Sequence, residues 1–402
     1  MLMLFAGKDS VHDGGRGNPI VAEMARTASR MESGVGVSAR RHKAVFITIV
    51  PSPYQRDLVA ALAAREDIDL SVCYLEASSP DSPWPRMPLR PFERVMPGFW
   101  IPFRGARWHF NWRLPELAAA DFVVLSSFSS WTGQWLMRHG LRGKKWLFWG
   151  ERLRAQTGGW RDTVQRELIA PLARATAIVG MGRAAEDDYR RRFPDPRHFC
   201  IPYHCDLSAF LATTRKIQAG APLTFFFCGQ MIRRKGVDLL LVAFDRLVAE
   251  GFDARLLLVG READLPQFLA AVSPAARALI RYEGFQPPER LPEYFARADV
   301  FVLPSQHDGW GVVVNQAIGA GLPVISSDAV GAGLDLVEEN INGLRFAAGD
   351  VDGLQRAMKI LVANPELARA WGEASRRKAL DITPEAGAEK WAGVFDALAE
   401  TR

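Results

Sequence analysis

The chain has 402 residues, of which 48% are hydrophobic and 24% are charged. This composition can build a substantial core, and the length predicts two or three domains. The formal net charge of +5 is small for this length, so we expect no nucleic-acid partner. The longest apolar runs, such as residues 239–244, are far shorter than the roughly 18 to 20 residues that span a bilayer, and no secretory signal opens the chain. We therefore expect a cytoplasmic protein whose membrane contact, if it has one, is at the inner face.

Residues 1–42 are rich in glycine, serine, alanine and arginine and show no sustained periodicity, so we expect a disordered leader. After the leader, short apolar runs alternate with amphipathic helical patterns. The apolar runs predict strands at 44–50, 70–74, 122–125, 145–149 and 177–180. Such alternation is typical of a parallel sheet with helices on both faces, and we assign residues 43–205 to a first Rossmann-like domain.

The segment from Pro83 to Arg113 concentrates arginine and tryptophan around a single acid, Glu93. Its basic and indole side chains are Arg86, Arg90, Arg94, Arg104, Arg107, Arg113, Trp84, Trp100, Trp108 and Trp112. These residue types suit a membrane interface that carries anionic headgroups, or a groove for a pyrophosphate-linked lipid. They also suit a proline-rich surface loop whose aromatic side chains turn into the core, and we favour this second interpretation.

Four cysteines are spread along the chain: Cys73, Cys200, Cys205 and Cys228. They lack the CxxC spacing and the supporting histidines of a zinc site. We expect four reduced thiols, with neither a bound metal nor a disulfide framework.

Residues 206–380 repeat the alternation of strands and helices, and we assign them to a second Rossmann-like domain. Strands are predicted at 223–227, 255–259, 280–282, 300–303 and 324–326. The polar stretch 213–220 is interpreted as a linker near the start of this domain. A final helix with an apolar face is predicted at 384–398.

Two glycine-containing turns in the second half follow predicted strands and precede predicted helices. The first lies in residues 227–244 (FCGQMIRRKGVDLLLVAF) and carries three consecutive basic residues; the second lies in residues 304–317 (PSQHDGWGVVVNQA) and carries an acid and two glycines. At the carboxyl edge of a parallel sheet, such turns direct backbone N–H groups and a helix N-terminus at a bound group, most often a phosphate. Two of them in one domain predict a site for a phosphate-bearing ligand.

These two segments resemble the nucleotide-sugar-binding half of the retaining glycosyltransferases of family four, also called group 1, which have the GT-B fold. The residues that match the family's turn for the donor diphosphate are Gly229, Arg234, Lys235 and Gly236. Gln230 stands where an arginine is commoner in the family. By this resemblance, the first turn binds the diphosphate of a nucleotide sugar.

The second turn resembles the family's motif of two glutamates separated by seven residues. Asp308 and Gln316 occupy the two acidic positions. Aspartate is one methylene shorter than glutamate, and glutamine keeps its hydrogen bonds but has no charge. The resemblance implies that Asp308 orients the transferred sugar, that Gln316 meets the ribose, and that Gly309 and Gly311 let the backbone approach the donor while Trp310 packs beneath.

Three charged residues are implied to be catalytic: Asp308, Lys235 and Arg234. Lys235, with Arg234 or Arg233, would neutralise the donor diphosphate where other glycosyltransferase folds use a divalent metal. No metal and no cofactor other than the nucleotide-sugar co-substrate is then expected. A solvated basic turn is the alternative interpretation of residues 233–235.

Other donor contacts are also implied by the resemblance. The helix that begins near Gly311 would offer the N–H groups of Val312 and Val313 to the diphosphate. Phe285 and Gln286 follow a predicted strand at the place where the family holds the nucleobase. They are the candidate base contacts.

The acceptor side gives fewer signals. Tyr54 and Gln55 lie in the first turn between strand and helix, where many relatives carry a pair of glycines. Glu151 ends a predicted strand and is either an acceptor-site residue or a helix-capping or ion-pairing residue. We expect His109 and His204 to be structural.

The resemblance implies two Rossmann-like domains facing across a cleft, with a helix in 381–402 returning to the first. It implies a metal-independent hexosyltransferase that retains configuration and moves a sugar from a UDP- or GDP-sugar to a glycan or lipid-linked acceptor. The products would be cell-surface polysaccharide, lipopolysaccharide or glycolipid. Two other functions stay open: a non-catalytic nucleotide-sugar-binding protein, for which positions 308 and 316 argue, and a nucleotide-sugar epimerase.

Overall fold

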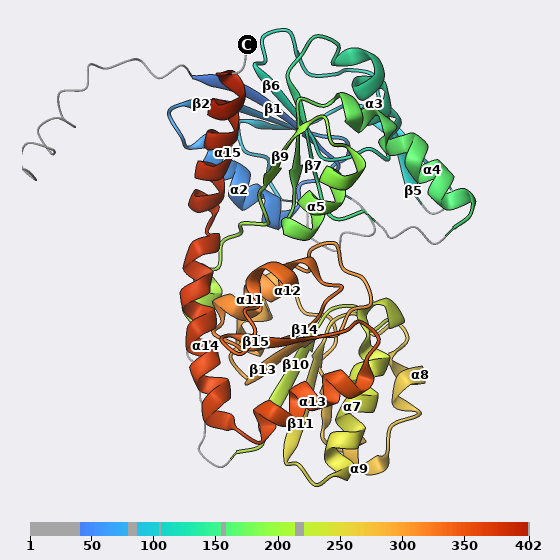
Figure 1. The fold of residues 1–402 in the computed structure, drawn as a ribbon, viewed down its shortest axis with the longest axis vertical. Coiled ribbons are helices and arrows are strands. Elements are labelled where there is room, and N and C mark those ends of the chain that lie inside the picture. Colours follow the sequence, from blue (N-terminus) through green and yellow to red (C-terminus); the bar gives the residue numbers. More distant parts are fainter. Residues whose placement is uncertain (1–40, 79–86, 104–105, 154–157, 214–220, 401–402) are drawn as a thin grey trace, which may run out of the picture. The chain divides into compact units, whose positions relative to one another are not determined.

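The computed structural model describes residues 41–78, 87–103, 106–153, 158–213 and 221–400. The predicted leader, apart from its last two residues, and most of the predicted linker at 213–220 lie outside these ranges. Two parallel sheets organise the described residues, and we call the parts that carry them the first and second lobes (Figure 1). The α/β class predicted from the alternating pattern is confirmed.

The sheet of the first lobe has seven strands within the described ranges, in the order β3-β2-β1-β6-β7-β8-β9, all parallel. Their bounds are β1 His42–Thr48, β2 Ile68–Tyr74, β3 Glu93–Val95, β6 Phe122–Leu125, β7 Trp146–Gly150, β8 Ala177–Gly180 and β9 Arg197–Cys200. The helices are α2 Pro53–Ala63, α3 Trp131–Trp135, α4 Trp160–Ile169 and α5 Arg183–Arg192, with a π-helical turn at Leu136–Gly140 and a 3-10 turn at Ala170–Arg174. Alternate residues of β1 enter two separate cores, because successive side chains of a strand point to opposite faces.

The arginine- and tryptophan-rich segment is not a loop. It contains β3 and an antiparallel hairpin of β4 (Gly98–Phe103) and β5 (Ala106–Asn111). The favoured interpretation, aromatic side chains turned into the core, is wrong for Trp100 and Trp112, which are exposed. Trp84, Arg86 and Arg104 lie outside the described residues.

The sheet of the second lobe has six parallel strands in the part of the chain described here, in the order β12-β11-β10-β13-β14-β15. Their bounds are β10 Leu223–Cys228, β11 Ala254–Val259, β12 Ile280–Tyr282, β13 Val300–Leu303, β14 Val324–Ser327 and β15 Gly343–Phe346. In both sheets the strand order reverses beside the first strand. Ligands of open parallel sheets bind outside the carboxyl ends of the strands at this reversal.

The helices of the second lobe and of the C-terminal part are α6 Ser208–Leu211, α7 Val237–Ala249, α8 Leu265–Leu269, α9 Pro274–Arg277, α10 Leu291–Phe295, α11 Val313–Gly319, α12 Gly331–Leu336, α13 Val351–Val362, α14 Pro365–Ala379 and α15 Pro384–Ala399. Helix α15 lies beside α2 of the first lobe (Figure 1). Its Trp391 and Phe395 rings lie with their centroids 5.0 Å from Phe46 and 4.9 Å from Phe122, respectively. These contacts make α15 part of the first lobe's core.

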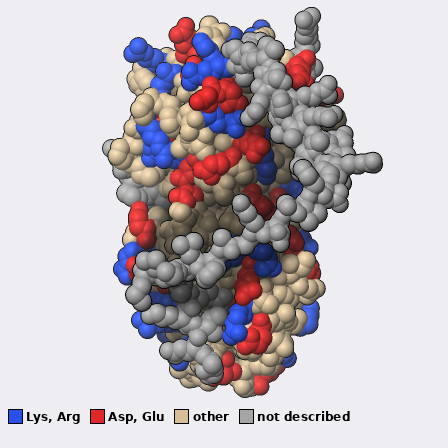
Figure 2. All heavy atoms as spheres, turned by 90° about the vertical axis from the view of Figure 1, so that its left-hand side faces the viewer, with Lys and Arg blue, Asp and Glu red and all other residues tan. Residues whose placement is uncertain are grey.

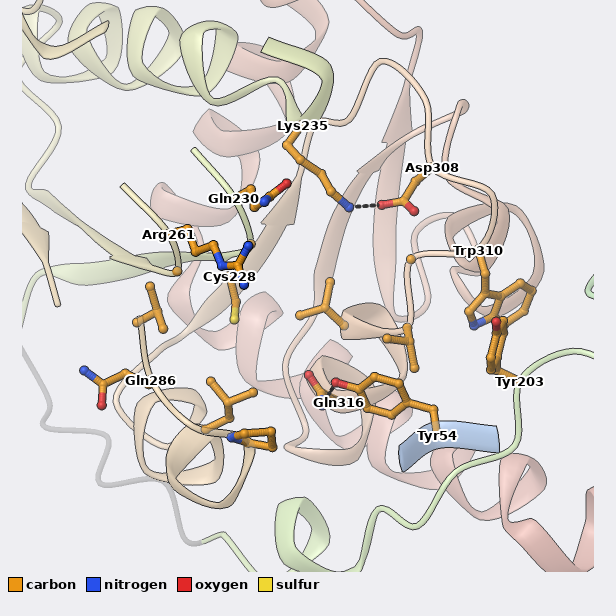
Figure 3. Close-up of a pocket in the computed structure, with 18 of the residues that line it drawn as sticks. Tyr54, Tyr203, Cys228, Gln230, Lys235, Arg261, Gln286, Asp308, Trp310 and Gln316 are labelled. Carbon is orange, nitrogen blue, oxygen red and sulfur yellow. Dashed lines mark hydrogen bonds and ion pairs between the residues drawn. The ribbon is translucent and has the colours of Figure 1, made fainter. Parts of the chain in front are cut away.

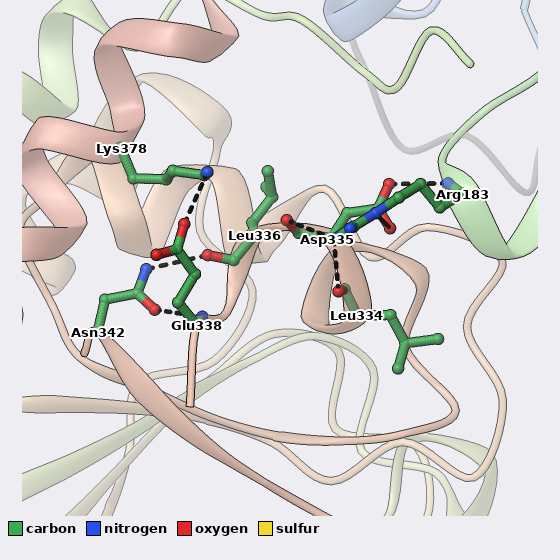
Figure 4. A network of polar contacts seen from close by, with 7 residues as sticks. All are labelled: Arg183, Leu334, Asp335, Leu336, Glu338, Asn342 and Lys378. Atoms are coloured by element: carbon green, nitrogen blue, oxygen red, sulfur yellow. Dashed lines mark hydrogen bonds and ion pairs between the residues drawn. The ribbon is translucent and has the colours of Figure 1, made fainter. Parts of the chain in front are cut away.

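A polar contact on α12 connects the two lobes (Figure 4). The backbone N–H of Arg183, at the start of α5, donates to Oδ2 of Asp335 at 2.8 Å, and its side chain donates to Oδ1 at 3.3 Å. The Arg183 side chain also donates to the carbonyl of Leu334 at 3.2 Å. The side chain of Asp335 is largely buried, so this contact satisfies a carboxylate that would otherwise be costly to bury.

The described residues contain no helix that is long and apolar enough to cross a membrane. Acidic and basic side chains are interspersed over the face in Figure 2, which includes the side of the molecule that carries α14 and α15. All four cysteines are free in the structure.

Candidate active site

A cavity of about 420 Å³ lies at the carboxyl ends of the strands of the second sheet (Figure 3). Most of its lining comes from turns that follow strands of the second lobe, and the first lobe contributes Ser52, Tyr54, Glu151 and Tyr203. The second-lobe residues are Cys228, Gly229, Gln230, Lys235, Val259, Gly260, Arg261, Phe285, Gln286, Pro288, Leu291, Asp308, Trp310, Gly311, Val312, Val313 and Gln316. The two glycine-containing turns of the sequence therefore meet in one place.

The backbone of two neighbouring turns comes close because glycines stand there. Gly260 has a φ of +139°, and a Cβ on it would overlap the carbonyl oxygen of Gly229. Gly236, at φ +70°, precedes α7, and a Cβ there would overlap the carbonyl oxygen of Pro304. These glycines bring the turns after β10, β11 and β13 together.

Lys235 and Asp308 form an ion pair in the cavity, with 2.5 Å between Nζ and Oδ2 (Figure 3). Both side chains are largely buried. The backbone of Asp308 is fixed on both sides, because its N–H donates to the carbonyl of Ala329 at 3.0 Å and its carbonyl accepts from Gly331 at 3.3 Å. The pair therefore joins a fixed carboxylate to a lysine at the end of a 3-10 turn.

The other two basic residues of the first turn do not line the cavity. Arg234 donates to the carbonyl of His307 at 3.0 Å, and Arg233 lies 3.6 Å from the carboxylate of Asp238. The cavity instead receives Arg261, which follows β11 and which the sequence analysis missed. Residues 254–261 do contain a sequence pattern that could have predicted Arg261: a buried strand is followed by a glycine and a basic residue, as in the first turn.

Residues 214–378 match the family model described as Glycosyl transferases group 1. This part of the chain, which carries the second lobe, is therefore similar to the group 1 glycosyltransferases. The chain is also similar to a GDP-mannose-dependent alpha-(1-6)-phosphatidylinositol monomannoside mannosyltransferase of Mycolicibacterium smegmatis. The two sequences are 32% identical over 161 residues, an alignment that covers 38% of this chain and 42% of that protein. It spans about half the length of the curated relatives it matches.

Solved structures show the same fold. A sucrose-phosphate synthase from Thermosynechococcus elongatus aligns with a TM-score of 0.69 and 20% identity, over 90% of this chain and 100% of that chain. Anabaena Alr3699/HepE in complex with UDP aligns with a TM-score of 0.65 and 13% identity, over 88% and 100%. The chain has the GT-B fold that the sequence resemblance implied.

Trp310 is buried beneath the second turn and supports it. Its Nε1 donates to Oδ1 of Asn315 at 2.9 Å, and Asn315 donates to the carbonyl of Tyr203 at 3.0 Å. The Tyr203 and Trp310 rings lie with centroids 6.2 Å apart. Gly182 of the first lobe also packs on Trp310, where a Cβ would come within 2.6 Å of the indole ring. Trp310 thus connects the second turn to the first lobe.

Glu151 of the first lobe opposes Gly309, which itself is not a lining residue of the cavity. A Cβ on Gly309 would overlap the carboxylate of Glu151. Tyr203 donates to Oε1 of Glu151 at 2.9 Å, and Tyr189 donates to its backbone carbonyl at 2.9 Å. The Glu151 side chain is in contact with solvent on one side and is surrounded by protein on the others. Desolvation, with a contribution from nearby Asp308, raises the pKa of Glu151 against the opposing effects of Tyr203 and Lys235.

Gln316 is buried in α11, and its amide donates to the hydroxyl of Tyr54 at 3.5 Å. Burial raises the pKa of Tyr54, so this phenol stays protonated. Of the predicted acceptor-side residues, Tyr54 and Glu151 line the cavity. Gln55 lies behind the lining and accepts a hydrogen bond from Thr48 at 3.3 Å.

The predicted base contacts lie at one end of the cavity. Phe285 is 49% exposed, with the guanidinium of Arg261 6.0 Å from its ring centroid. The amide of Gln286 donates to the carbonyl of Glu283 at 2.7 Å. Val312 and Val313 lie at the start of α11, where the first N–H groups have no partner inside the helix.

Three possible reactive side chains, Cys228, His204 and His109, are kept from reacting by burial. Burial raises the pKa of the Cys228 thiol to about 12, which keeps the thiol protonated. His204 and His109 are both buried outside the cavity. His109 lies on β5, and its Nε2 is 3.4 Å from Oε1 of Glu76. In the described residues, no group of three or more histidine, cysteine or acidic side chains is arranged to hold a metal ion.

Proposed function

We propose that this protein is a retaining, metal-independent glycosyltransferase that moves a sugar from a UDP- or GDP-sugar to a glycan or lipid-linked acceptor. The observation that carries the proposal is the convergence of Lys235, Arg261 and Asp308 on one cavity at the carboxyl edge of the second sheet. The group 1 match supports a nucleotide-sugar donor. The matched mycobacterial relative is named for a phosphatidylinositol-linked acceptor, which supports a lipid-linked acceptor here.

The donor diphosphate would lie against the turns after β10 and β11. Lys235 and Arg261 supply positive charge, and the bare backbone at Gly229 and Gly260 permits close approach. Arg261 takes the part that the sequence resemblance gave to Arg234. These groups would stabilise the charge that grows on the phosphate as the glycosidic bond breaks.

Asp308 would bind hydroxyl groups of the transferred sugar. Its carboxylate can do so once a donor phosphate replaces it as the partner of Lys235, because both anions compete for the same ammonium. In the proposed step, the bond from the anomeric carbon to the phosphate oxygen breaks and a bond to the acceptor oxygen forms on the same face. The acceptor proton passes to the departing phosphate, so the step needs no protein nucleophile.

Glu151 is proposed to position the acceptor. It is the acidic lining residue of the first lobe, and its carboxyl lies against Gly309 in the sugar-directed turn. Its carboxylate can accept a hydrogen bond from an acceptor hydroxyl and so hold that hydroxyl near the sugar-directed turn.

The first experiment is a calorimetric titration of UDP, GDP and their common sugar conjugates into the wild type and three variants: Lys235→Ala, Arg261→Ala and the control Lys359→Ala. Lys359 is a surface lysine paired with Glu250 far from the cavity. We expect one nucleotide to bind, with at least about tenfold weaker binding in the first two variants and no change in the control. Equal binding by all four proteins would overturn the donor site.

A second experiment separates transfer from binding alone. The nucleotide sugar that binds is incubated with lipid and glycan extracts, and the product's anomeric configuration is determined by NMR. We expect nucleoside diphosphate release, a product of retained configuration, and unchanged turnover with EDTA. Binding without turnover would favour a non-catalytic binding protein, and conversion of the free donor to its epimer would favour an epimerase.

A further inference from the structure

The first lobe carries a cluster of exposed large apolar side chains, which we call the aromatic face. Eight of the fourteen such side chains in the described residues belong to β4, the residue after β5, α3 and α4. They are Phe99, Trp100, Ile101, Trp112, Trp131, Trp135, Trp160 and Val164. Exposed apolar clusters of this kind mark interaction sites, because water is a poor environment for them.

Ring contacts join parts of the aromatic face into one surface. Phe110 stacks on Phe99 with 5.3 Å between centroids and on Trp131 with 5.4 Å, so it links the hairpin to α3. Trp112 lies 6.4 Å from Phe99 and is 69% exposed. Phe99 and Ile101 share one side of the hairpin with Phe110, and Trp100 lies on the other side, because successive side chains of a strand alternate. The hairpin therefore exposes apolar side chains on both of its sides.

Helix α4 is held beside α3 and the π-helical turn that follows it by hydrogen bonds from side chains to backbone carbonyls. The amide of Gln134 donates to the carbonyl of Leu168 at 2.8 Å, and Arg138 donates to the carbonyl of Glu167 at 2.9 Å. These bonds place α4, which carries the exposed Trp160 and Val164, beside α3 (Figure 1).

Arginines accompany the exposed rings. Residues 98–103, 106–113, 131–142 and 158–169 contain Arg107, Arg113, Arg138, Arg142, Arg161 and Arg166. The acids in these ranges are Asp162, which is buried, and Glu167; Glu76, outside the ranges, pairs with Arg107 at 2.9 Å, so five arginines remain against Glu167. The guanidinium of Arg107 lies 4.0 Å over the Trp100 ring, and that of Arg161 lies 5.5 Å from the Trp160 ring. The aromatic face thus combines apolar rings with a positive charge excess.

The aromatic face borders the acceptor side of the cavity. Helices α3 and α4 begin after the carboxyl ends of β6 and β7, and Trp131 and Trp160 are their first residues. Glu151, which lines the cavity, directly follows β7. Both features therefore belong to the same edge of the first sheet.

We propose that the aromatic face docks on the surface of an anionic phospholipid bilayer. Tryptophan prefers the boundary between headgroups and acyl chains, and arginine is attracted by anionic headgroups. This surface extends the membrane contact predicted for residues 83–113 to α3 and α4. Docking is independent of the proposed transfer, since it involves none of the cavity residues.

The test is co-sedimentation of the protein with two kinds of vesicle. One is made of phosphatidylcholine alone, and the other also contains about 30 mol% phosphatidylglycerol, which gives the vesicle a negative surface. We expect binding to the anionic vesicles that weakens as salt rises. Vesicles that contain brominated lipid should quench tryptophan fluorescence, because the indoles enter the headgroup region. Equal binding to both vesicles, or none to either, would overturn the proposal.

Two paired variants separate the two contributions. Trp112→Ser/Trp131→Ser should remove most of the quenching, and Arg142→Glu/Arg161→Glu should weaken binding by about tenfold or more. The matched controls are Leu380→Ser and Arg369→Glu, which change exposed residues of the C-terminal helices. Lys235→Ala should bind vesicles like the wild type, so a failure of the donor site does not affect this result. Loss of self-association in the tryptophan variant without any vesicle binding would assign the face to a second copy instead.

Discussion

The ammonium of Lys235 and the carboxylate of Asp308 lie 2.5 Å apart although 73 positions separate them in the chain. Each neutralises the other inside a largely buried cavity. In the proposed donor site, a phosphate that takes the place of Asp308 beside Lys235 would free this carboxylate for a neutral, hydroxyl-bearing group. Such an exchange would couple phosphate binding to sugar binding.

The exchange predicts opposite effects for the two partners. Asp308→Asn removes the competing negative charge, so binding of the free nucleoside diphosphate should be equal or tighter while transfer falls by at least about a hundredfold. Lys235→Ala should weaken nucleotide binding itself. Calorimetry and turnover on the same preparations check both effects. Weaker diphosphate binding in Asp308→Asn would contradict the exchange.

Two glycines of the cavity region should respond differently to alanine. Gly260→Ala places a Cβ on the backbone of Gly229 at a φ that favours glycine, so we expect a loss of about 2 kcal/mol or more in unfolding free energy. Gly309→Ala meets the movable side chain of Glu151, so the fold should persist while activity falls. Chemical denaturation and turnover measure the two effects. In the double variant Gly309→Ala/Glu151→Ala the side chain that meets the new Cβ is gone, so any stability lost in Gly309→Ala should return. Turnover should stay low, because the carboxylate of Glu151 is also gone.

The buried pair of Arg56 and Glu93 should make stability depend on acid. Arg56 donates two hydrogen bonds to Glu93, at 2.8 and 2.5 Å, and Tyr74 donates a third at 2.8 Å. Burial opposes the charge, but these bonds and one from the N–H of Arg90 together lower the pKa of Glu93 below its ordinary 4.5. Its stabilisation is therefore present above pH 4.5 and is lost as the pH falls through the lower folded value.

Glu93→Gln should consequently cost about 3 kcal/mol or more at pH 7, because it leaves the Arg56 charge buried without its partner. The difference in unfolding free energy between wild type and variant should shrink as the pH falls below 4.5. Urea denaturation at several pH values measures this. A difference that does not vary with pH would show that the charge of Glu93 is not the stabilising feature.

His204 should give a second and separate pH dependence. Burial lowers its pKa from 6.5 to about 4, while its Nδ1 lies 2.8 Å from the carbonyl of Pro202. The unfolded chain takes up a proton near pH 6.5 and the folded protein does not, so stability from neutral His204 declines between pH 6.5 and 4 by about 3 kcal/mol. His204→Asn cannot take up this proton and should lack that part of the slope. An identical slope in both proteins would contradict the assignment.

The strands were largely predictable because strands buried on both faces are continuous apolar runs. The runs at 122–125, 177–180 and 300–303 coincide with β6, β8 and β13. Strand β9 was missed because its sequence RHFC is polar and half-exposed, and the β4–β5 hairpin was missed because prolines and arginines interrupt it. Pairing between strands, not local pattern, defines these elements.

The candidate site was predictable only where its residues share a turn. Lys235 and Asp308 stand in segments whose glycines already indicate a tight turn. Arg261 and Tyr203 are single residues, and their entry into the cavity depends on the order in which the strands pair. Whether a basic residue such as Arg234 faces the cavity or its rim depends on one 3-10 turn, which the sequence does not reveal.

Helix α15 imposes an order on the folding of the nascent chain. Its residues, among them Trp391 and Phe395, fill the core between α2 and the first sheet, yet they are translated after the whole second lobe. The first lobe therefore leaves the ribosome with one apolar face uncovered, and it cannot complete its core until α15 has been translated. The second lobe can pack before that point. Chaperones that shield exposed apolar surface would act on this protein during that interval, and a chain interrupted before residue 384 would retain the uncovered face permanently.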